Sequence, residues 1–130
     1  MANNGRVEVA LSIPPAVDAP MRARAEVGGL RVPRPAVDDI TLLVSEVVTN
    51  CVVHADLAPG QEIHLRITRD PDTVRVEVCD EGRGFADSLL NGSHSSGFGL
   101  YLVEQLADRW GYDVHGGRTR VWFELSSSAS

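Results

Sequence analysis

The sequence predicts an α+β fold, a two-layer sandwich in which helices cover one face of a mostly antiparallel mixed sheet. Two observations support this class. In several segments apolar residues alternate with polar ones, as they do along half-buried strands, and in others they recur at helical spacing. The segments follow one another as strand, helix, helix, hairpin, loop, helix and hairpin. This order suits helices gathered on one face of a sheet.

The first half of the chain is expected to hold one strand and two helices. Alternation in 6–13 predicts a strand, which Pro14 ends. Segment 16–30 has helix-forming composition and finishes at Gly28–Gly29, a suitable C-cap. Segment 36–55 has the clearest helical stripe, formed by Ile40, Val44, Val47 and Cys51.

The second half begins with a hairpin. Residues 63–68 and 74–78 alternate at period two around a turn at 70–73, which predicts two antiparallel strands. Segment 86–96 has no sustained period and is rich in turn formers, so we expect a mobile loop that orders as a lid when a ligand binds.

A helix and a second hairpin complete the chain. The helical stripe runs through Leu100, Val103, Leu106 and Trp110. It is expected to close at Gly111. The last hairpin, 112–125, turns at Gly116 and Gly117, which are expected to supply positive φ angles.

Composition limits the function classes. A chain of 130 residues with 43% hydrophobic content predicts a single domain, 1–130, with an ordered core of about 6–126. The formal net charge of -6 gives no basic footprint, so we expect no nucleic-acid partner. Neither a long apolar run nor a targeting segment is found, which predicts no membrane partner and a cytoplasmic location.

The two cysteines, Cys51 and Cys79, indicate neither a disulfide framework nor a closed zinc site. Cys51 and His54 have helical i, i+3 spacing. We interpret Cys51 as a small buried thiol near a helix end rather than as a metal ligand.

Glu46 and Asn50 lie four residues apart, so both side chains project from one face of the expected helix. A carboxylate and a carboxamide at this spacing suit Mg²⁺, which takes oxygen ligands and borrows the rest from waters and phosphates. The alternative is a solvated helix face without a ligand.

The stretch "DEGRGF" places Asp80 at the exit of a strand, with Gly82 and Gly84 close behind. A carboxylate there can accept a hydrogen bond from an exocyclic amine, and the glycines let the backbone approach a flat ring. The alternative is an ordinary turn that ends the strand.

Gly97 and Gly99 stand at the entry of the last expected helix. Free N–H groups at such an end favour anions such as phosphate. The alternative is a flexible hinge. The chain has neither a P-loop nor a Rossmann fingerprint, and GxSxG is absent.

Taken in order and spacing, "SEVVTNCVVHA", "DEGRGF" and "GFGLYLVEQLADRWG" closely resemble the N, G1 and G2 boxes of the GHKL ATPase superfamily. These Bergerat-fold proteins include gyrase and the histidine kinases. The small size and the phrase "LVEQLADRWG" look like the RsbW and SpoIIAB class of anti-sigma factors, which are serine-protein kinases. The resemblance spans about Val7 to Leu125, and it implies ATP and Mg²⁺ as cofactors.

Carried over by position, the resemblance implies that Glu46 is the general base or the acid that positions the nucleophile, and that Asn50 binds Mg²⁺. Asp80 would bond the adenine amine, and Gly82 and Gly84 would shape the base pocket. The residues implied at the phosphate-side end of the lid are Gly97, Phe98, Gly99 and Leu100.

Two functions stay open. The first is an ATP-dependent protein serine/threonine kinase that phosphorylates a STAS-type anti-anti-sigma protein and sequesters a sigma factor; Glu46 and Asn50 favour it. The second is a non-catalytic module in which ATP shapes a surface for a partner. The expected lid, 86–96, favours the second, because it has no Lys or Arg to stabilise a γ-phosphate. A homodimer is also left open.

Overall fold

The structure, a computed structural model, describes residues 6–30, 34–54, 58, 60–81, 98–116 and 118–126. Within them the elements follow the predicted order. They are β1 (Val7–Ile13), α1 (Ala19–Gly28), α2 (Arg34–His54), β2 (Ile63–Arg69), β3 (Thr73–Asp80), α4 (Phe98–Leu106), β4 (Arg109–His115) and β5 (Arg118–Ser126).

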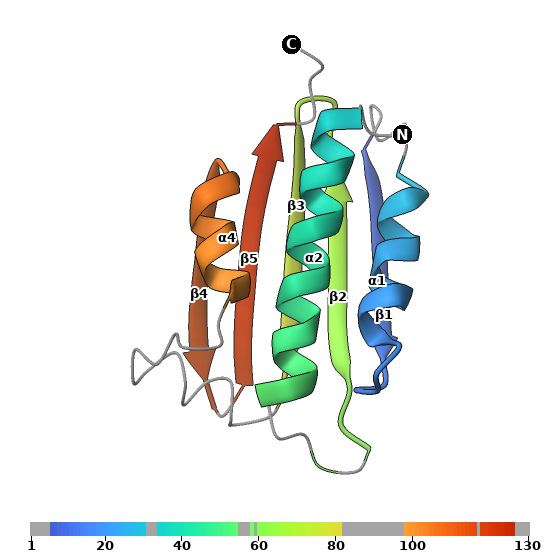
Figure 1. The fold of residues 1–130 in the computed structure, drawn as a ribbon, viewed down its shortest axis with the longest axis vertical. Coiled ribbons are helices and arrows are strands. Elements are labelled where there is room, and N and C mark those ends of the chain that lie inside the picture. Colours follow the sequence, from blue (N-terminus) through green and yellow to red (C-terminus); the bar gives the residue numbers. More distant parts are fainter. Residues whose placement is uncertain are drawn as a thin grey trace.

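The strands form one sheet in the order β1-β2-β3-β5-β4. Each pairing between these described strands is antiparallel, so no parallel pair of the expected mixed sheet occurs among them. Figure 1 shows α1, α2 and α4 side by side on one face of the sheet. The predicted α+β two-layer class is confirmed.

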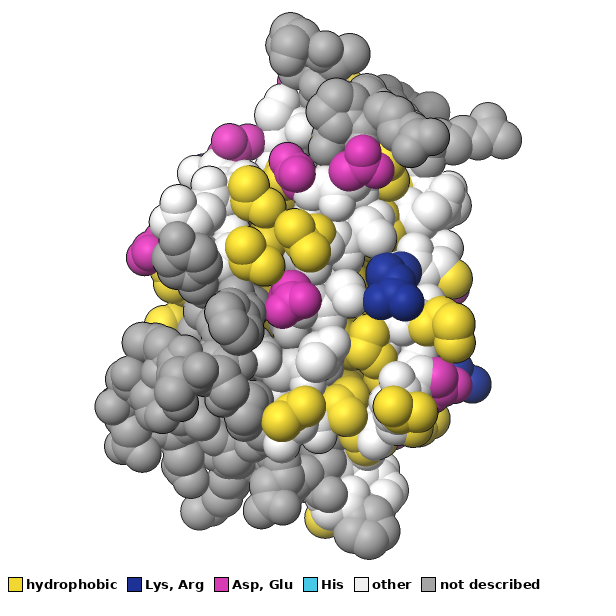
Figure 2. All heavy atoms as spheres, viewed as in Figure 1, with side chains coloured by type: hydrophobic (Ala, Val, Ile, Leu, Met, Phe, Trp, Pro, Cys, Tyr) yellow, Lys and Arg dark blue, Asp and Glu magenta, His cyan; other side chains and the backbone are white. Residues whose placement is uncertain are grey.

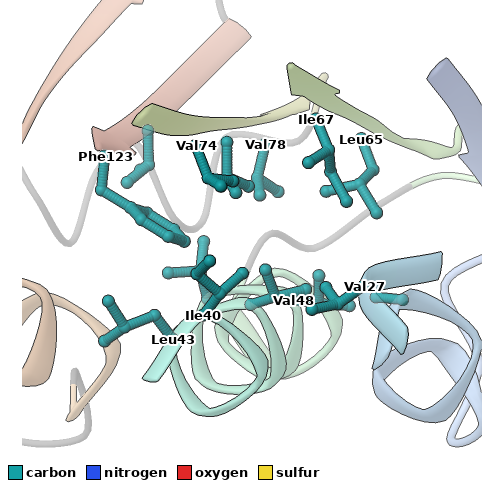
Figure 3. Close-up of a cluster of buried hydrophobic side chains, with 14 of the residues drawn as sticks. Val27, Ile40, Leu43, Val48, Leu65, Ile67, Val74, Val78 and Phe123 are labelled. Atoms are coloured by element: carbon teal, nitrogen blue, oxygen red, sulfur yellow. The ribbon is translucent and has the colours of Figure 1, made fainter. Parts of the chain in front are cut away.

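The hydrophobic core fills the space between the sheet and the helices (Figure 3). Phe123 and Val78 point from the strands toward Ile40 and Val48 of α2. The helical stripe predicted on α2 is confirmed, since each of its members is at most 1% exposed: Ile40, Val44, Val47 and Cys51. Removal of these side chains from water is the main force that holds the two layers together.

The prediction for the end of the last helix was wrong. α4 ends at Leu106, and Trp110 lies in β4, where it pairs with Phe123 of β5. The backbone N–H of Asp108 already donates to the Glu124 carbonyl at 2.9 Å, which joins the chain to β5 directly after the helix. Trp110 continues the helical spacing, but the apolar residues at 110, 112 and 114 also fit the two-residue repeat of a strand. Pairing with β5 decided in favour of the strand.

Gly111 does not close a helix, as predicted, but lies within β4 opposite Trp122. A Cβ at position 111 would stand 2.9 Å from the indole Nε1 of Trp122, so the close approach of this ring requires a glycine. Gly116, with φ of 63°, supplies the predicted positive φ in the turn, and Gly117 lies outside the described residues. At the first predicted C-cap, α1 ends at Gly28 with Gly29 as the cap.

Ion pairs lie on the opposite, open face of the sheet. Arg75 bonds Glu77 at 2.9 Å and Glu124 at 2.8 Å, and its guanidinium stacks 4.3 Å from the ring centroid of Trp122. Arg120 bonds Asp113 at 2.8 Å. The Arg120–Asp113 pair is exposed to water, and pairs of this kind contribute little to stability.

Candidate functional site

The elements that carry the predicted site residues meet at one end of the molecule. Figure 1 shows the C-terminal end of α2, the end of β3, the start of β5 and the N-terminal end of α4 at this end. Asn50 and Cys51 lie in the last turns of α2, and Asp80 is the last residue of β3. The fold therefore brings the first two sequence boxes together.

Three polar side chains are buried in the described part of the chain: Asn50 at 4% exposure, Asp80 at 1% and Thr119 at 1%. Burial of a polar group costs free energy unless a partner compensates, so such groups mark places where a partner is needed. All three come from the elements that meet at this end. Asn50 and Asp80 are also residues with predicted roles, Asn50 as a ligand of Mg²⁺ and Asp80 as the acceptor for the adenine amine.

Glu46 and Asn50 lie one turn apart on α2, as predicted. Glu46 is half-buried, whereas Asn50 is almost fully buried. The alternative of a solvated helix face is therefore wrong for Asn50. Because Glu46 keeps partial access to water, its carboxylate can serve a nucleophile that arrives from outside, while the Asn50 amide faces inward.

Asp80 contacts the residue that follows Asn50. The Cys51 thiol donates a hydrogen bond to Asp80 Oδ2 over 3.4 Å, which links α2 to β3. Burial, together with the carboxylate beside it, raises the pKa of the Cys51 thiol well above its ordinary value. The thiol therefore stays protonated and acts as a donor, and the expectation of a buried thiol near a helix end is confirmed.

Thr119 is the cross-strand partner of Asp80 in the pairing of β3 with β5. Directly opposite residues in an antiparallel pair project to the same side of the sheet, here the side covered by helices. The hydroxyl Oγ1 of Thr119 has no hydrogen-bond partner among the described residues. A buried donor without a partner is costly, and it is satisfied when a ligand or a water binds beside it.

The remaining predicted site residues are only partly described. Phe98, Gly99 and Leu100 form the first turn of α4, as expected for a helix entry. Gly82, Gly84, Gly97 and the expected lid at 86–96 lie outside the described residues. In the described part of the chain no three His, Cys, Asp or Glu side chains cluster as a metal site. A Mg²⁺ ion held by one amide and by phosphates would not need such a cluster.

A hollow of about 700 Å³ lies elsewhere, on the open face of the sheet. Its lining includes His64, Glu77, Cys79, Arg118 and Arg120, and it contains neither Asn50 nor Asp80. Charged groups there already have ion-pair partners, which are Asp113 for Arg120 and Glu81 for Arg118. We therefore place the candidate site at the buried polar residues and not at this hollow.

The buried polar groups at this end offer hydrogen-bonding sites that suit a polar, amine-bearing ligand. A buried carboxylate offers acceptors for an amine, the Thr119 hydroxyl offers a donor and an acceptor, and the Asn50 amide offers an oxygen for a hard cation. The helix-covered face in Figure 2 mixes acidic, basic, apolar and uncharged side chains, and the chain carries a net charge of -6.

Residues 15–125 match the histidine kinase-like ATPase domain family. The match covers most of the chain, and the chain therefore belongs to this family. Membership places it among ATP-binding domains and confirms the resemblance to the GHKL superfamily. No curated protein sequence matches the chain.

Among solved structures, the chain is similar to the crystal structure of the RsbU and RsbW domains of Rv1364c from Mycobacterium tuberculosis. The TM-score is 0.71 at 20% sequence identity, and the alignment covers 95% of this chain. It covers 33% of that chain, so this protein spans about a third of the longer one. The likeness establishes a shared fold. No helix within the described ranges has the length and apolar character needed to cross a membrane.

Sequence reasoning missed two groups of this site. Thr119 is covered by the sequence prediction only as part of the last hairpin, 112–125, because its place opposite Asp80 depends on pairing between strands that lie far apart in the sequence. Cys51 was interpreted as an inert buried thiol. Its position directly after Asn50 was the one available indication that it would lie beside the site.

Proposed function

We propose that this protein is an ATP-dependent protein serine kinase of the anti-sigma class. It would phosphorylate a STAS-type anti-anti-sigma protein and, in another partner state, hold a sigma factor. The observation that carries the proposal is the meeting of buried Asp80, Asn50 and Thr119 at one end of a histidine kinase-like ATPase domain. The RsbW domain in the similar structure supports the anti-sigma part.

In this proposal each residue has a separate task. Asp80 would accept a hydrogen bond from the adenine amine, and Gly82 and Gly84 would leave room for the ring. Asn50 would bind Mg²⁺, which would neutralise phosphate charge, and the residues proposed for the phosphate side are Gly97, Phe98, Gly99 and Leu100.

Glu46, half-buried one turn before Asn50, would act on the substrate hydroxyl. It takes the proton from a partner serine while that oxygen bonds the γ-phosphorus. The bond from phosphorus to the β-γ bridging oxygen breaks, and ADP leaves with the electron pair.

A second candidate function is a binding module in which ATP orders a partner-binding surface and no phosphate moves. One sequence observation favours it: segment 86–96 contains neither Lys nor Arg. Phosphoryl transfer uses positive charge beyond the metal, so the kinase needs that charge from Arg83 or from its partner.

The deciding experiment starts with a pull-down from native lysate, with and without ATP, to find the partners. Each partner is then incubated with the protein, Mg²⁺ and radiolabelled ATP. Phosphate on a serine of a partner supports the kinase. ATP-dependent partner binding without any transfer supports the binding module, and a protein that binds neither ATP nor ADP in calorimetry contradicts both.

A further inference from the structure

The Cys51 thiol lies where it can control the orientation of the Asp80 carboxylate. Its Sγ is 3.4 Å from Asp80 Oδ2, and both residues are 1% exposed. In a buried place of this kind water does not compete for the carboxylate oxygen, so the thiol can influence the rotamer of Asp80. The bond also crosses from the helix layer to the sheet layer, which ties the carboxylate to α2.

The thiol takes only part of the hydrogen-bonding capacity of the Asp80 carboxylate. An ionised carboxylate has about four lone-pair sites on two oxygens, and a thiol is a weak donor that occupies one of them. With Oδ2 bonded by Cys51, the rotation of the carboxylate is restrained, and with it the direction in which the other lone pairs point. An amine of a bound base meets an acceptor that is already oriented.

A second observation points to a ligand at the same place. Thr119 projects from β5 beside Asp80, and its buried hydroxyl has no partner among the described residues. A carboxylate held in place next to an unsatisfied hydroxyl is a polar recess that a hydrogen-bonding ligand completes.

We propose that Cys51 is a positioning residue for base recognition: by holding Asp80 Oδ2 it orients the carboxylate that selects a base with an exocyclic amine. The inference rests on the proposed function, since it assumes that Asp80 meets adenine. It gives Cys51 a part in base selectivity, in addition to its packing in the core.

The test compares two nucleotides on three proteins. ATP and purine riboside triphosphate share ribose and phosphates, and only ATP has the exocyclic amine. Calorimetry with Mg²⁺ gives both affinities for the wild type, Cys51→Ala and Cys51→Ser. We expect Cys51→Ala to lower ATP affinity by about 3- to 10-fold, as for loss of a weak hydrogen bond to a charged group, with less than about twofold change for the amine-free nucleotide.

The serine variant separates positioning from packing. A hydroxyl is a stronger donor on a shorter bond, so Cys51→Ser should regain most of the preference for ATP. Cys79→Ala is the matched control, because Cys79 is half-exposed on the open face of the sheet. The ratio of its affinity for ATP to its affinity for the amine-free nucleotide should equal the ratio of the wild type.

An equal loss for both nucleotides in Cys51→Ala would show a packing role and overturn the proposal, as would no loss for either. If Cys51→Ala does not fold, the Cys51→Ser protein decides alone. A preference for ATP over the amine-free nucleotide close to that of the wild type supports the proposal, and an equal loss of affinity for both nucleotides overturns it. A wild type that binds both nucleotides equally would overturn the role of Asp80 itself, and one that binds neither would overturn the proposed function as well.

Discussion

Two adjacent cross-strand residue pairs of β3 and β5 lie on opposite faces of the sheet and differ in their exposure to water. Asp80 pairs with Thr119 on the helix-covered face, and Cys79 pairs with Arg120 on the open face. Arg120 is 43% exposed and has its partner, Asp113, within 2.8 Å. Thr119 is 1% exposed, and none of the described residues bonds its hydroxyl. One step along the strand therefore changes a polar group from a solvated surface feature into a buried, unsatisfied one.

The difference shows how to locate a site in this fold. Charges are far more frequent on the open face, but water and neighbouring ions already satisfy them, so their presence indicates no ligand. On the covered face polar groups are few and costly, and each one needs an explanation. Changes on the covered face should therefore alter ligand binding or chemistry, whereas changes on the open face should alter neither.

The largest effect is expected at Glu46. Glu46→Gln keeps the shape and removes the base, so phosphate transfer to the partner should fall by roughly 10²- to 10⁴-fold while ATP and partner binding persist. Single-turnover transfer from radiolabelled ATP measures the rate. Glu26→Gln, a half-buried glutamate on α1, is the control and should transfer at the wild-type rate. Transfer by Glu46→Gln at that same rate would exclude Glu46 as the base.

The next effect is expected at Asp80. Asp80→Asn should weaken ATP binding by about 1.5 to 3 kcal/mol, the range for a hydrogen bond to a charged group, because the amine of adenine loses its charged acceptor. Calorimetry measures the affinity. Since Asp80 is buried and bonds Cys51, unfolding by urea must be followed alongside. Asp113→Asn makes the same chemical change on the open face, and equal ATP affinity in both variants would mean that the base pocket lies elsewhere.

A smaller effect is expected at Thr119, and there the substitution should raise the stability of the free protein rather than lower it. Thr119→Val replaces a buried hydroxyl without a partner by a methyl group of similar size, so the free energy of unfolding without ligand should rise by about 1 kcal/mol. ATP affinity should fall at the same time if the hydroxyl serves the ligand. Urea unfolding and calorimetry give both quantities. Thr68→Val, at a half-exposed position of β2, is the control, and a destabilised Thr119→Val would show that the hydroxyl is satisfied in the free protein.

The smallest effect is expected on the open face. Asp113→Asn removes the partner of Arg120, and both side chains are largely exposed, so the free energy of unfolding should change by less than about 0.5 kcal/mol. ATP affinity should not change. A loss well above 1 kcal/mol would mean that the ion pairs of this face stabilise the sheet as strongly as the buried groups do, and the contrast between the faces would not hold.

Much of the fold follows from local patterns. The stripe on α2 and the alternation in β2, β3 and β5 are set by residues close together in the sequence, so the elements and the α+β class could be predicted. The position of Glu46 and Asn50 on one helix face is equally local. Gly99 was expected at the entry of the last helix, and it lies in the first turn of α4.

Contacts between distant segments could be decided only by the tertiary structure. Trp110 fits a helical and a strand period alike, and pairing with Phe123 placed it in β4. The register that sets Thr119 opposite Asp80 joins residues 39 positions apart, and the packing of α2 on the sheet brings Cys51 to the same carboxylate. Local sequence determines which face of an element is apolar, because that depends on a repeat of two or 3.6 residues. The partner of a buried polar group depends on how the layers pack, and no local repeat encodes it.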